Sequence, residues 1–80
     1  MPVVLRVDGL KFFFYSNEGN PLEPVHVHVR RAGCEAKIWL QPEIQIARNE
    51  GFDAKALKKI LELVQQHQEA LKEAWYEYFA

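Results

Sequence analysis

The hydrophobic pattern of this 80-residue chain changes its period once, close to Asp53. Before Asp53, apolar residues alternate with polar ones or form short runs bounded by turn residues, which is typical of β-strands. After it, apolar residues recur every three or four positions through residues 53–79, without glycine or proline, which predicts a helix. Because a chain of this length forms one domain, we expect a single α+β domain over residues 1–80. Its sheet would occupy residues 2–48, packed on one long C-terminal helix over residues 53–79.

Two turn signals divide the predicted sheet into two antiparallel β-hairpins. Asp8-Gly9 separates two apolar runs, and an Asp-Gly pair suits a two-residue turn in which both residues take positive φ. Ala32-Gly33 is a weaker signal of the same kind. The first turn pairs Val7 with Leu10, Leu5 with Phe12, and Val3 with Phe14. The second pairs Val29 with Ala36, Val27 with Ile38, and Val25 with Leu40 on one face, and Arg30 with Glu35, His28 with Lys37, and His26 with Trp39 on the other. Residues 43–48 alternate weakly and are a candidate short fifth strand.

The composition argues against several classes of protein. The formal net charge is −1, so the chain lacks the bulk positive charge that binds nucleic acid or anionic membranes, and only a local basic patch stays open. Cys34 is the single cysteine, so no intramolecular disulfide can form, which favours a reducing cytoplasm. No apolar run approaches the ~18 residues of a membrane span. We therefore expect a cytoplasmic protein with no membrane partner, and the sequence indicates no cofactor.

The predicted helix is long for so small a domain. A straight helix over residues 53–79 would run roughly 40 Å, whereas a compact domain of this size is only about 30 Å across. Its C-terminal turns should therefore overhang, bend or meet a partner. Aromatic residues gather in these turns, and we predict that they form an interface with another protein or with a second copy in a homodimer. These residues are Trp75, Tyr76, Tyr78 and Phe79.

Strand alternation places His26, His28 and Arg30 on one face of the second hairpin. Two histidines at this spacing can converge on one metal ion, but a catalytic zinc site needs a third ligand. Lys37 beside His28 argues against a bound dication, because it adds positive charge. The candidate third ligands are Glu18, Glu23, Glu35, Cys34 and His67, and the sequence does not select among them.

A second interpretation treats the same face as a phosphate site for metal-free RNA cleavage or RNA binding. The catalytic acid and base would be His26 and His28. The residues that would hold the phosphate or stack on bases are Arg30, Lys37, Trp39 and Tyr15. A third interpretation is an ordinary sheet with one solvated face, whose histidines are exposed or satisfied by their neighbours.

Five segments of the chain together resemble one family. They read PVVLRVDGLKFFFYSNEG, PVHVHV, AKIWL, ARNEGF and EAWYEYF, and they span nearly the whole chain. In this order they are similar to small bacterial proteins of the domain of unknown function 4160 family, in which a second proline often stands in place of Val25. The resemblance implies no established activity and transfers no catalytic residue. It implies a protein partner, because such proteins look like they are often encoded beside another small protein, an arrangement typical of toxin–antitoxin modules.

The leading hypothesis is therefore a small cytoplasmic bacterial protein of a toxin–antitoxin-like module. It would act through a small protein encoded nearby, with RNA or another phosphate ligand as a target of the His/Arg face. The first alternative is a metal-binding protein or metal-dependent enzyme centred on His26 and His28. The second is a structural interaction module without chemistry. The sequence leaves open whether the protein is an enzyme.

Overall fold

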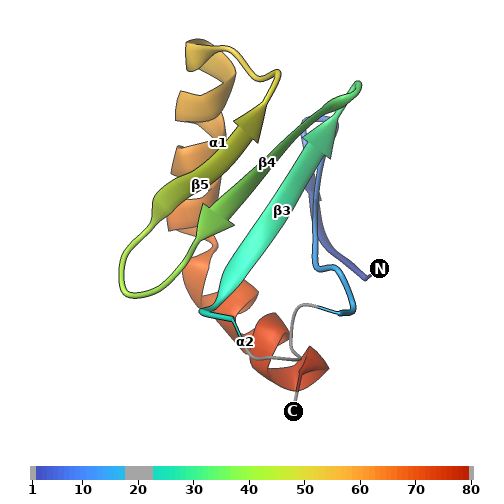
Figure 1. The fold of residues 1–80 in the computed structure, drawn as a ribbon, viewed down its shortest axis with the longest axis vertical. Helices are drawn as coiled ribbons and strands as arrows, with labels where there is room; N and C mark the ends of the chain where they lie inside the picture. Colours follow the sequence, from blue (N-terminus) through green and yellow to red (C-terminus); the bar gives the residue numbers. More distant parts are fainter. Residues whose placement is uncertain (1, 18–22, 80) are drawn as a thin grey trace.

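The computed structural model describes residues 2–17 and 23–79 (Figure 1). Five strands form one antiparallel sheet in which spatial neighbours follow chain order. The strands are β1 (Val3–Val7), β2 (Leu10–Phe13), β3 (His26–Arg31), β4 (Cys34–Trp39) and β5 (Gln45–Glu50). Two helices follow, α1 (Ala54–Gln66) and α2 (Gln68–Tyr78). The α+β class predicted from the change of hydrophobic period is confirmed, and β5 is the fifth strand, two residues later than the expected 43–48.

The two hairpins are not separate units, because β2 also pairs with β3 and joins them into one meander. In the first turn Asp8 and Gly9 have φ of 51° and 78°. In the second, Ala32 and Gly33 have φ of 48° and 83°. Both turns therefore take the conformation with positive φ at both central residues that two-residue hairpins favour. Positive φ is uncommon for alanine, which explains why the second turn is the weaker signal in the sequence.

The register predicted for the second hairpin is confirmed along β3 and β4. The first hairpin has the predicted register near its turn, but Val3 pairs with Phe13 and not with Phe14. The reason is a β-bulge: Val4 is an extra residue in β1, and it shifts the pairing by one position. Bulges are frequent on edge strands such as β1, and the alternation of apolar residues does not reveal them.

The prediction of one long C-terminal helix is wrong, because two helices meet at His67. The N–H of His67 still donates to the carbonyl oxygen of Leu63 at 3.0 Å, but its ψ of 15° departs from helical values. A straight helix of roughly 40 Å would exceed the longest dimension of the molecule, which is 34 Å. After the break, α2 turns beneath the end of the sheet at which β3 begins (Figure 1). Bending is one of the outcomes that the helix length predicts.

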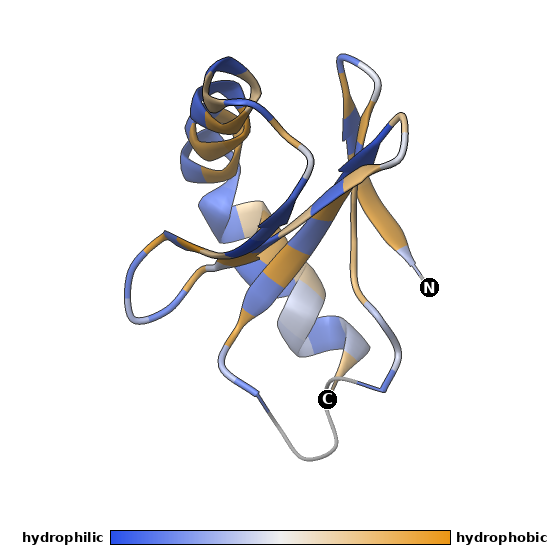
Figure 2. Ribbon diagram, turned by 45° about the horizontal axis from the view of Figure 1, so that its top comes forward, coloured by the Kyte–Doolittle hydropathy of each residue, from blue (hydrophilic) through white to orange (hydrophobic). Residues whose placement is uncertain are grey.

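One face of the sheet is covered by α1 and holds most of the hydrophobic core. Its buried side chains come from β2, β3, β4 and α1, and they include Leu10, Phe12, Val27, Val29, Ala36, Ile38, Ile60 and Val64. Asp53 caps α1, since its Oδ1 accepts a hydrogen bond from the backbone N–H of Ala56 at 2.8 Å. Figure 2 shows β3 alternating between hydrophobic and hydrophilic residues, so every second residue of β3 faces away from α1. We call that opposite side of the sheet the open face.

Candidate functional site

Cross-strand pairing aligns the side chains of the open face in three rows that run across the sheet. The first row holds Arg6, Lys11, Arg30, Glu35 and Glu50, one from each strand. The second row holds Phe13, His28, Lys37 and Arg48. The third row holds His26, Trp39 and Gln45. The predicted catalytic and ligand-binding residues of β3 and β4 therefore lie together on one surface.

The Glu35 carboxylate is the acceptor at the centre of a hydrogen-bonded network on this surface. Arg30 donates to Oε1 from Nη2 at 2.7 Å and from Nε at 3.1 Å. The Tyr15 hydroxyl lies 3.1 and 3.0 Å from the two carboxylate oxygens. Arg48 Nη2 and His28 Nδ1 each lie 3.9 Å from Oε2. Glu35 thus joins Tyr15 to the predicted site residues of β3 and to Arg48 of β5, although the sequence identified it only as the cross-strand partner of Arg30 and as one candidate metal ligand.

These contacts shift three pKa values. Burial alone would raise the pKa of Glu35, but hydrogen bonds from Arg30 and Tyr15 outweigh it and hold the pKa below its ordinary value. The pKa of Tyr15 is raised, first by burial and then by its hydrogen bond to Glu35. The pKa of Arg30 is raised by its hydrogen bond to Glu35. At neutral pH the network therefore consists of a carboxylate, a phenol and a guanidinium, and none of the three titrates near pH 7.

His26 and His28 are buried, with 0% and 1% of their surface exposed, although they lie on the open face. The two rings are 5.2 Å apart and perpendicular to one another. Aromatic rings surround them: His28 lies 4.6 Å from Tyr15 and 5.6 Å from Phe13, and His26 lies 4.7 Å from Trp75 and 5.4 Å from Trp39. The imidazoles are therefore part of an aromatic cluster beneath the surface, and the part of the solvated-face interpretation that exposes them is wrong.

The backbone fixes the tautomer of His26. Its Nδ1 lies 2.9 Å from the carbonyl oxygen of Pro24. A carbonyl oxygen only accepts hydrogen bonds, so Nδ1 carries the proton and Nε2 is the basic nitrogen of the neutral ring. The pair His26 and His28 thus keeps one feature of a catalytic acid and base, a defined proton position. The catalytic role stays a prediction.

The two cations predicted to hold a phosphate are already paired with carboxylates. Arg30 pairs with Glu35, and Lys37 Nζ donates to Glu23 Oε1 at 2.8 Å. Each also lies against a ring: the Lys37 nitrogen is 4.5 Å from the centre of Trp39, and the Arg30 guanidinium is 5.3 Å from the centre of Phe13. A ligand anion would therefore have to compete with Glu23 or Glu35 for these two side chains.

The other end of the first row is different. Arg6 and Lys11 are exposed and face each other across β1 and β2, and Lys11 in turn faces Arg30. Within residues 2–17 and 23–79, neither Arg6 nor Lys11 makes an ion pair. The register of the first hairpin, which pairs Val7 with Leu10, also places Arg6 opposite Lys11. The pairing of β2 with β3, which adds Arg30, could not be predicted from either hairpin alone.

The four aromatic residues predicted as an interface fall into two groups. Trp75 is 2% exposed and lies 5.4 Å from the Phe14 ring, so it belongs to the core. Phe79 packs against the Trp75 ring at 4.2 Å. Tyr76 and Tyr78 are 53% and 41% exposed. Only the two tyrosines are therefore presented to a partner, and the interface stays a prediction for them.

The metal interpretation finds no geometric support in the part of the chain that the structure describes. There, no three His, Cys, Asp or Glu side chains are arranged to hold an ion. Of the candidate third ligands, Glu23 pairs with Lys37, and His67 ends α1. Cys34 is partly buried beside Gly51. Glu18 lies outside the described residues.

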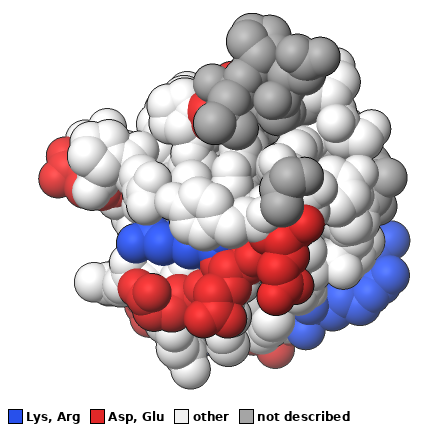
Figure 3. Space-filling view, turned by 90° about the horizontal axis from the view of Figure 1, so that it is seen from below, with Lys and Arg blue, Asp and Glu red and all other residues white. Residues whose placement is uncertain are grey.

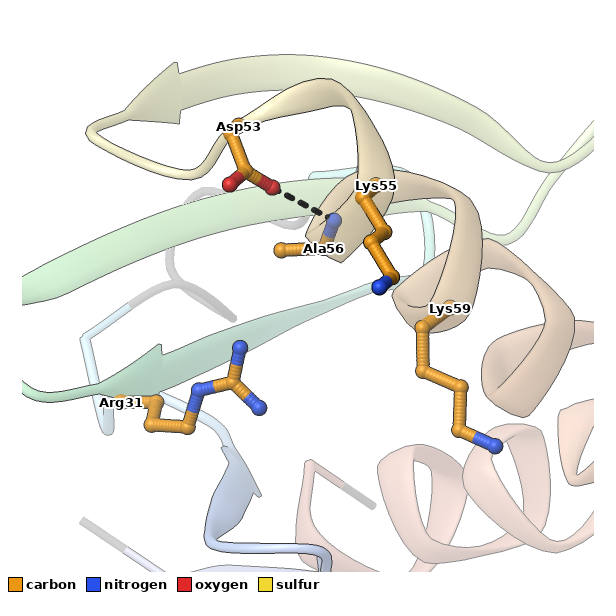
Figure 4. A pocket seen from close by; sticks show the side chains of 5 residues that line it. All are labelled: Arg31, Asp53, Lys55, Ala56 and Lys59. Carbon is orange, nitrogen blue, oxygen red and sulfur yellow. Dashed lines mark hydrogen bonds between the residues drawn. The ribbon is translucent and has the colours of Figure 1, made fainter.

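A pocket of about 290 Å³ lies on the other side of the sheet, where α1 begins. It is lined by Arg31, Asp53, Lys55, Ala56 and Lys59, and Figure 4 shows the basic side chains around one gap. Two of these basic side chains already interact with Asp8 of the same chain. Lys59 lies 3.9 Å from an Asp8 oxygen, Arg31 donates to the carbonyl of Asp8 at 3.5 Å, and Asp53 caps the helix. The open face is therefore the stronger candidate site.

Comparison with known proteins identifies a family. The family model described as Domain of unknown function (DUF4160) matches residues 9–76. No curated protein and no solved structure matches the chain. Within residues 2–17 and 23–79, neither helix has the length and apolar character that crossing a membrane would require.

Proposed function

The chain belongs to the DUF4160 family, and from that premise we propose that it is one component of a two-protein, toxin–antitoxin-like module and binds RNA on its open face. The supporting observation is the cationic row, which we define as Arg6, Lys11 and Arg30 on three neighbouring strands. Neighbouring strands lie roughly 4.8 Å apart, so the backbone positions of these three residues span about 10 Å.

The cationic row is electrostatically unsatisfied. Like charges directly opposite each other on a sheet are destabilising, and Glu35 neutralises only Arg30. A bound polyanion would remove the repulsion that Arg6 and Lys11 exert on each other. The row is also small and local, which agrees with a chain whose formal net charge is −1 and which therefore lacks a general attraction for nucleic acid.

The aromatic residues indicate which part of an RNA the face would contact. Lys37 lies over Trp39, and Arg30 lies over Phe13, so the chain's own cations occupy these ring faces. Bases would therefore stack poorly, and phosphates would supply most of the contacts. Phosphate contacts carry little sequence information and depend strongly on salt. We expect binding that is tolerant of sequence and weak at physiological salt.

Fluorescence anisotropy with a single-stranded RNA of about 20 nucleotides tests this proposal. At about 50 mM salt, the double variant Arg6→Gln/Lys11→Gln should lose at least tenfold in affinity, and its salt dependence should fall by roughly 0.7 logarithmic units per lost contact. The matched control is Lys55→Gln/Lys58→Gln, which removes the same charge from α1, on the other side of the sheet. Equal losses in both double variants would reduce the effect to net charge and refute the open face as the site.

Metal-free RNA cleavage by His26 and His28 is the second candidate, favoured by their 5.2 Å separation and the defined proton on His26. Both rings are buried, so a phosphodiester reaches them only if the side chains that cover them move. Cleavage of labelled RNA by protein prepared with metal chelator provides the test. His26→Gln should abolish cleavage and leave RNA affinity unchanged. An equal cleavage rate in this variant would exclude the histidine mechanism.

The partner of the module would dock at the end of α2. Tyr76 and Tyr78 are exposed there, and tyrosines are enriched at protein interfaces. The same helix exposes Glu69, Glu73 and Glu77, and Figure 3, which views the molecule from below, shows acidic side chains gathered on that face. A small protein encoded nearby with a basic, aromatic-binding surface would match this end.

Co-purification of the two proteins tests the partner. The untagged neighbour should elute with the tagged chain, and Tyr76→Ala/Tyr78→Ala should release it. Tyr15→Phe is the control, because it also alters a tyrosine, but the Tyr15 ring packs on Phe13 and His28. Separate elution of the two wild-type proteins after mixing would count against the module, whereas RNA binding would remain to be judged by its own experiment.

A further inference from the structure

β5 forms one edge of the sheet, and all six of its residues are exposed. Ile46, on the same side as α1, is 39% exposed, so the helix does not cover this part of the edge. An edge strand presents backbone N–H and C=O groups that can pair with a strand of another chain. The question is which strand the β5 edge fits.

The register shows which backbone groups of β5 point outward. The N–H of Leu40 donates to the carbonyl oxygen of Val25 at 2.8 Å. Hydrogen-bonded pairs alternate along an antiparallel ladder, so every second residue of β4, including Ala36, directs its backbone groups to β3. Asn49 faces Ala36 across the β4–β5 pair. Asn49 therefore directs its own N–H and C=O away from the sheet.

The charges at this edge are arranged as two like-charge pairs. Glu35 faces Glu50 in the first row, and Lys37 faces Arg48 in the second row. Like charges in directly opposite positions are destabilising. Arg48 relieves part of this cost, since its Nε lies 3.0 Å from Glu50 and its Nη2 lies 3.9 Å from Glu35. The edge thus carries an acidic pair and, two residues away along the strand, a basic pair.

We propose that two copies of this chain form a dimer by antiparallel pairing of their β5 strands around a two-fold axis at Asn49. This register places Arg48 of each copy opposite Glu50 of the other. In the first row, Glu35 and Glu50 of one copy are then followed by Arg48 and Lys37 of the other copy. In the second row, Lys37 and Arg48 of one copy are followed by Glu50 and Glu35 of the other. The two Asn49 residues face each other and exchange hydrogen bonds through their outward backbone groups.

The two-fold arrangement also predicts the strength and the shape of the dimer. Gly51 has a φ of 104°, which ends the strand on one side, and Ala47 is the extra residue of a bulge on the other. The paired segment is therefore short, and the association belongs with the small, weak interfaces, with a dissociation constant on the order of 10 µM. Both open faces lie on the same side of the joined sheet, because the axis is perpendicular to it.

Sedimentation velocity of the full chain up to about 200 µM tests the dimer. The wild type should move from the mass of one chain to that of two. Arg48→Glu and Glu50→Arg should each weaken association at least tenfold, because each places like charges opposite each other across the axis. An equimolar mixture of the two variants should restore a dimer, since the two glutamates of one chain then face the two arginines of the other. A folding defect would not be cured by mixing.

Arg6→Glu is the matched control, because it makes the same charge change on the opposite edge strand, and it should leave the dimer intact. Circular dichroism verifies that each variant is folded. A wild type with the mass of one chain throughout would overturn the proposal, as would a dimer that survives both single variants. A mixture of folded variants that stays monomeric would overturn it as well. Wild-type chains that pair at β5 only with the strand of another protein would assign this edge to that protein instead.

Discussion

The two faces of the sheet bury their residues by different means. On the face beneath α1, Val27, Val29 and Ile38 are fully buried by other apolar side chains. On the open face, His26 and His28 are as deeply buried, but by aromatic rings and by a network that includes an ionised carboxylate. The first face depends on apolar area removed from water, and the second on polar partners that must all be present. The open face therefore has groups that can exchange their partners for a ligand, whereas Val27, Val29 and Ile38 of the covered face have no polar partner to exchange.

The largest expected difference in stability is between alanine variants of two isoleucines that face each other across β4 and β5. Ile38 is fully buried under α1, and its partner Ile46 is 39% exposed. Ile38→Ala should lower the free energy of unfolding by about 2–5 kcal/mol, through lost transfer energy and the cavity it leaves. Ile46→Ala should cost less than about 1 kcal/mol. Urea denaturation measures both, and equal costs would mean that α1 does not seal this face.

The covered face could be predicted almost completely from the sequence. Alternation in residues 25–40 and the Ala32-Gly33 turn determine the register, and the apolar repeat after Asp53 determines the helix. The features that could not be predicted depend on the whole domain. The helix length predicts an overhang, a bend or a partner but not a break at His67, and apolar alternation does not reveal the bulge at Val4, which reflects the freedom of an edge strand. Neither leaves a glycine or a proline in the sequence to mark it.

A smaller effect on the free energy of unfolding is expected when Glu35, at the centre of the open-face network, loses its charge. Glu35→Gln keeps the shape of the side chain but leaves Arg30 without its anion. We expect a loss of about 1 kcal/mol in the free energy of unfolding, because the Arg30 end of the pair is solvent-exposed and water replaces much of the interaction. Lys58→Gln, on an exposed turn of α1, is the control and should be nearly neutral. A loss above about 3 kcal/mol would place this network in the structural core, like that of the covered face.

Acid should remove the same contribution from the wild type. The pKa of Glu35 is lowered in the folded protein from its ordinary value of 4.5, so the unfolded chain binds the proton first as the pH falls. The stabilisation is present above pH 4.5 and is lost as the pH falls through the folded pKa. The difference in stability between wild type and Glu35→Gln should therefore shrink as the pH falls below 4.5. Denaturation at pH 7 and at a series of pH values below 4.5 checks this, and a difference that does not shrink in acid would contradict the role of the Glu35 charge.

The sequence predicts which residues lie on the open face but not the contacts that join them to other segments. The sequence identifies His26, His28, Arg30, Lys37 and their cross-strand partners. It does not show that Tyr15 reaches Glu35, or that Trp75 of α2 packs on His26. Both contacts join segments whose relative position depends on how β2 meets β3 and on where the helix bends. Local alternation carries no information about either.

The smallest expected effect has opposite signs for two lysines of the same face. Lys11 stands between Arg6 and Arg30 without an ion pair in the described part of the chain, whereas Lys37 pairs with Glu23 at 2.8 Å. Lys11→Gln removes like-charge repulsion and should raise the free energy of unfolding by a few tenths of a kcal/mol, while it weakens RNA binding. Lys37→Gln should lower the free energy of unfolding by about 0.2–1 kcal/mol. Thermal unfolding at low salt measures both changes, and added salt should reduce each because it screens exposed charges. A Lys11→Gln variant that is less stable than the wild type would show that the cationic row is not under electrostatic strain, and would remove the main support for RNA binding at that end of the open face.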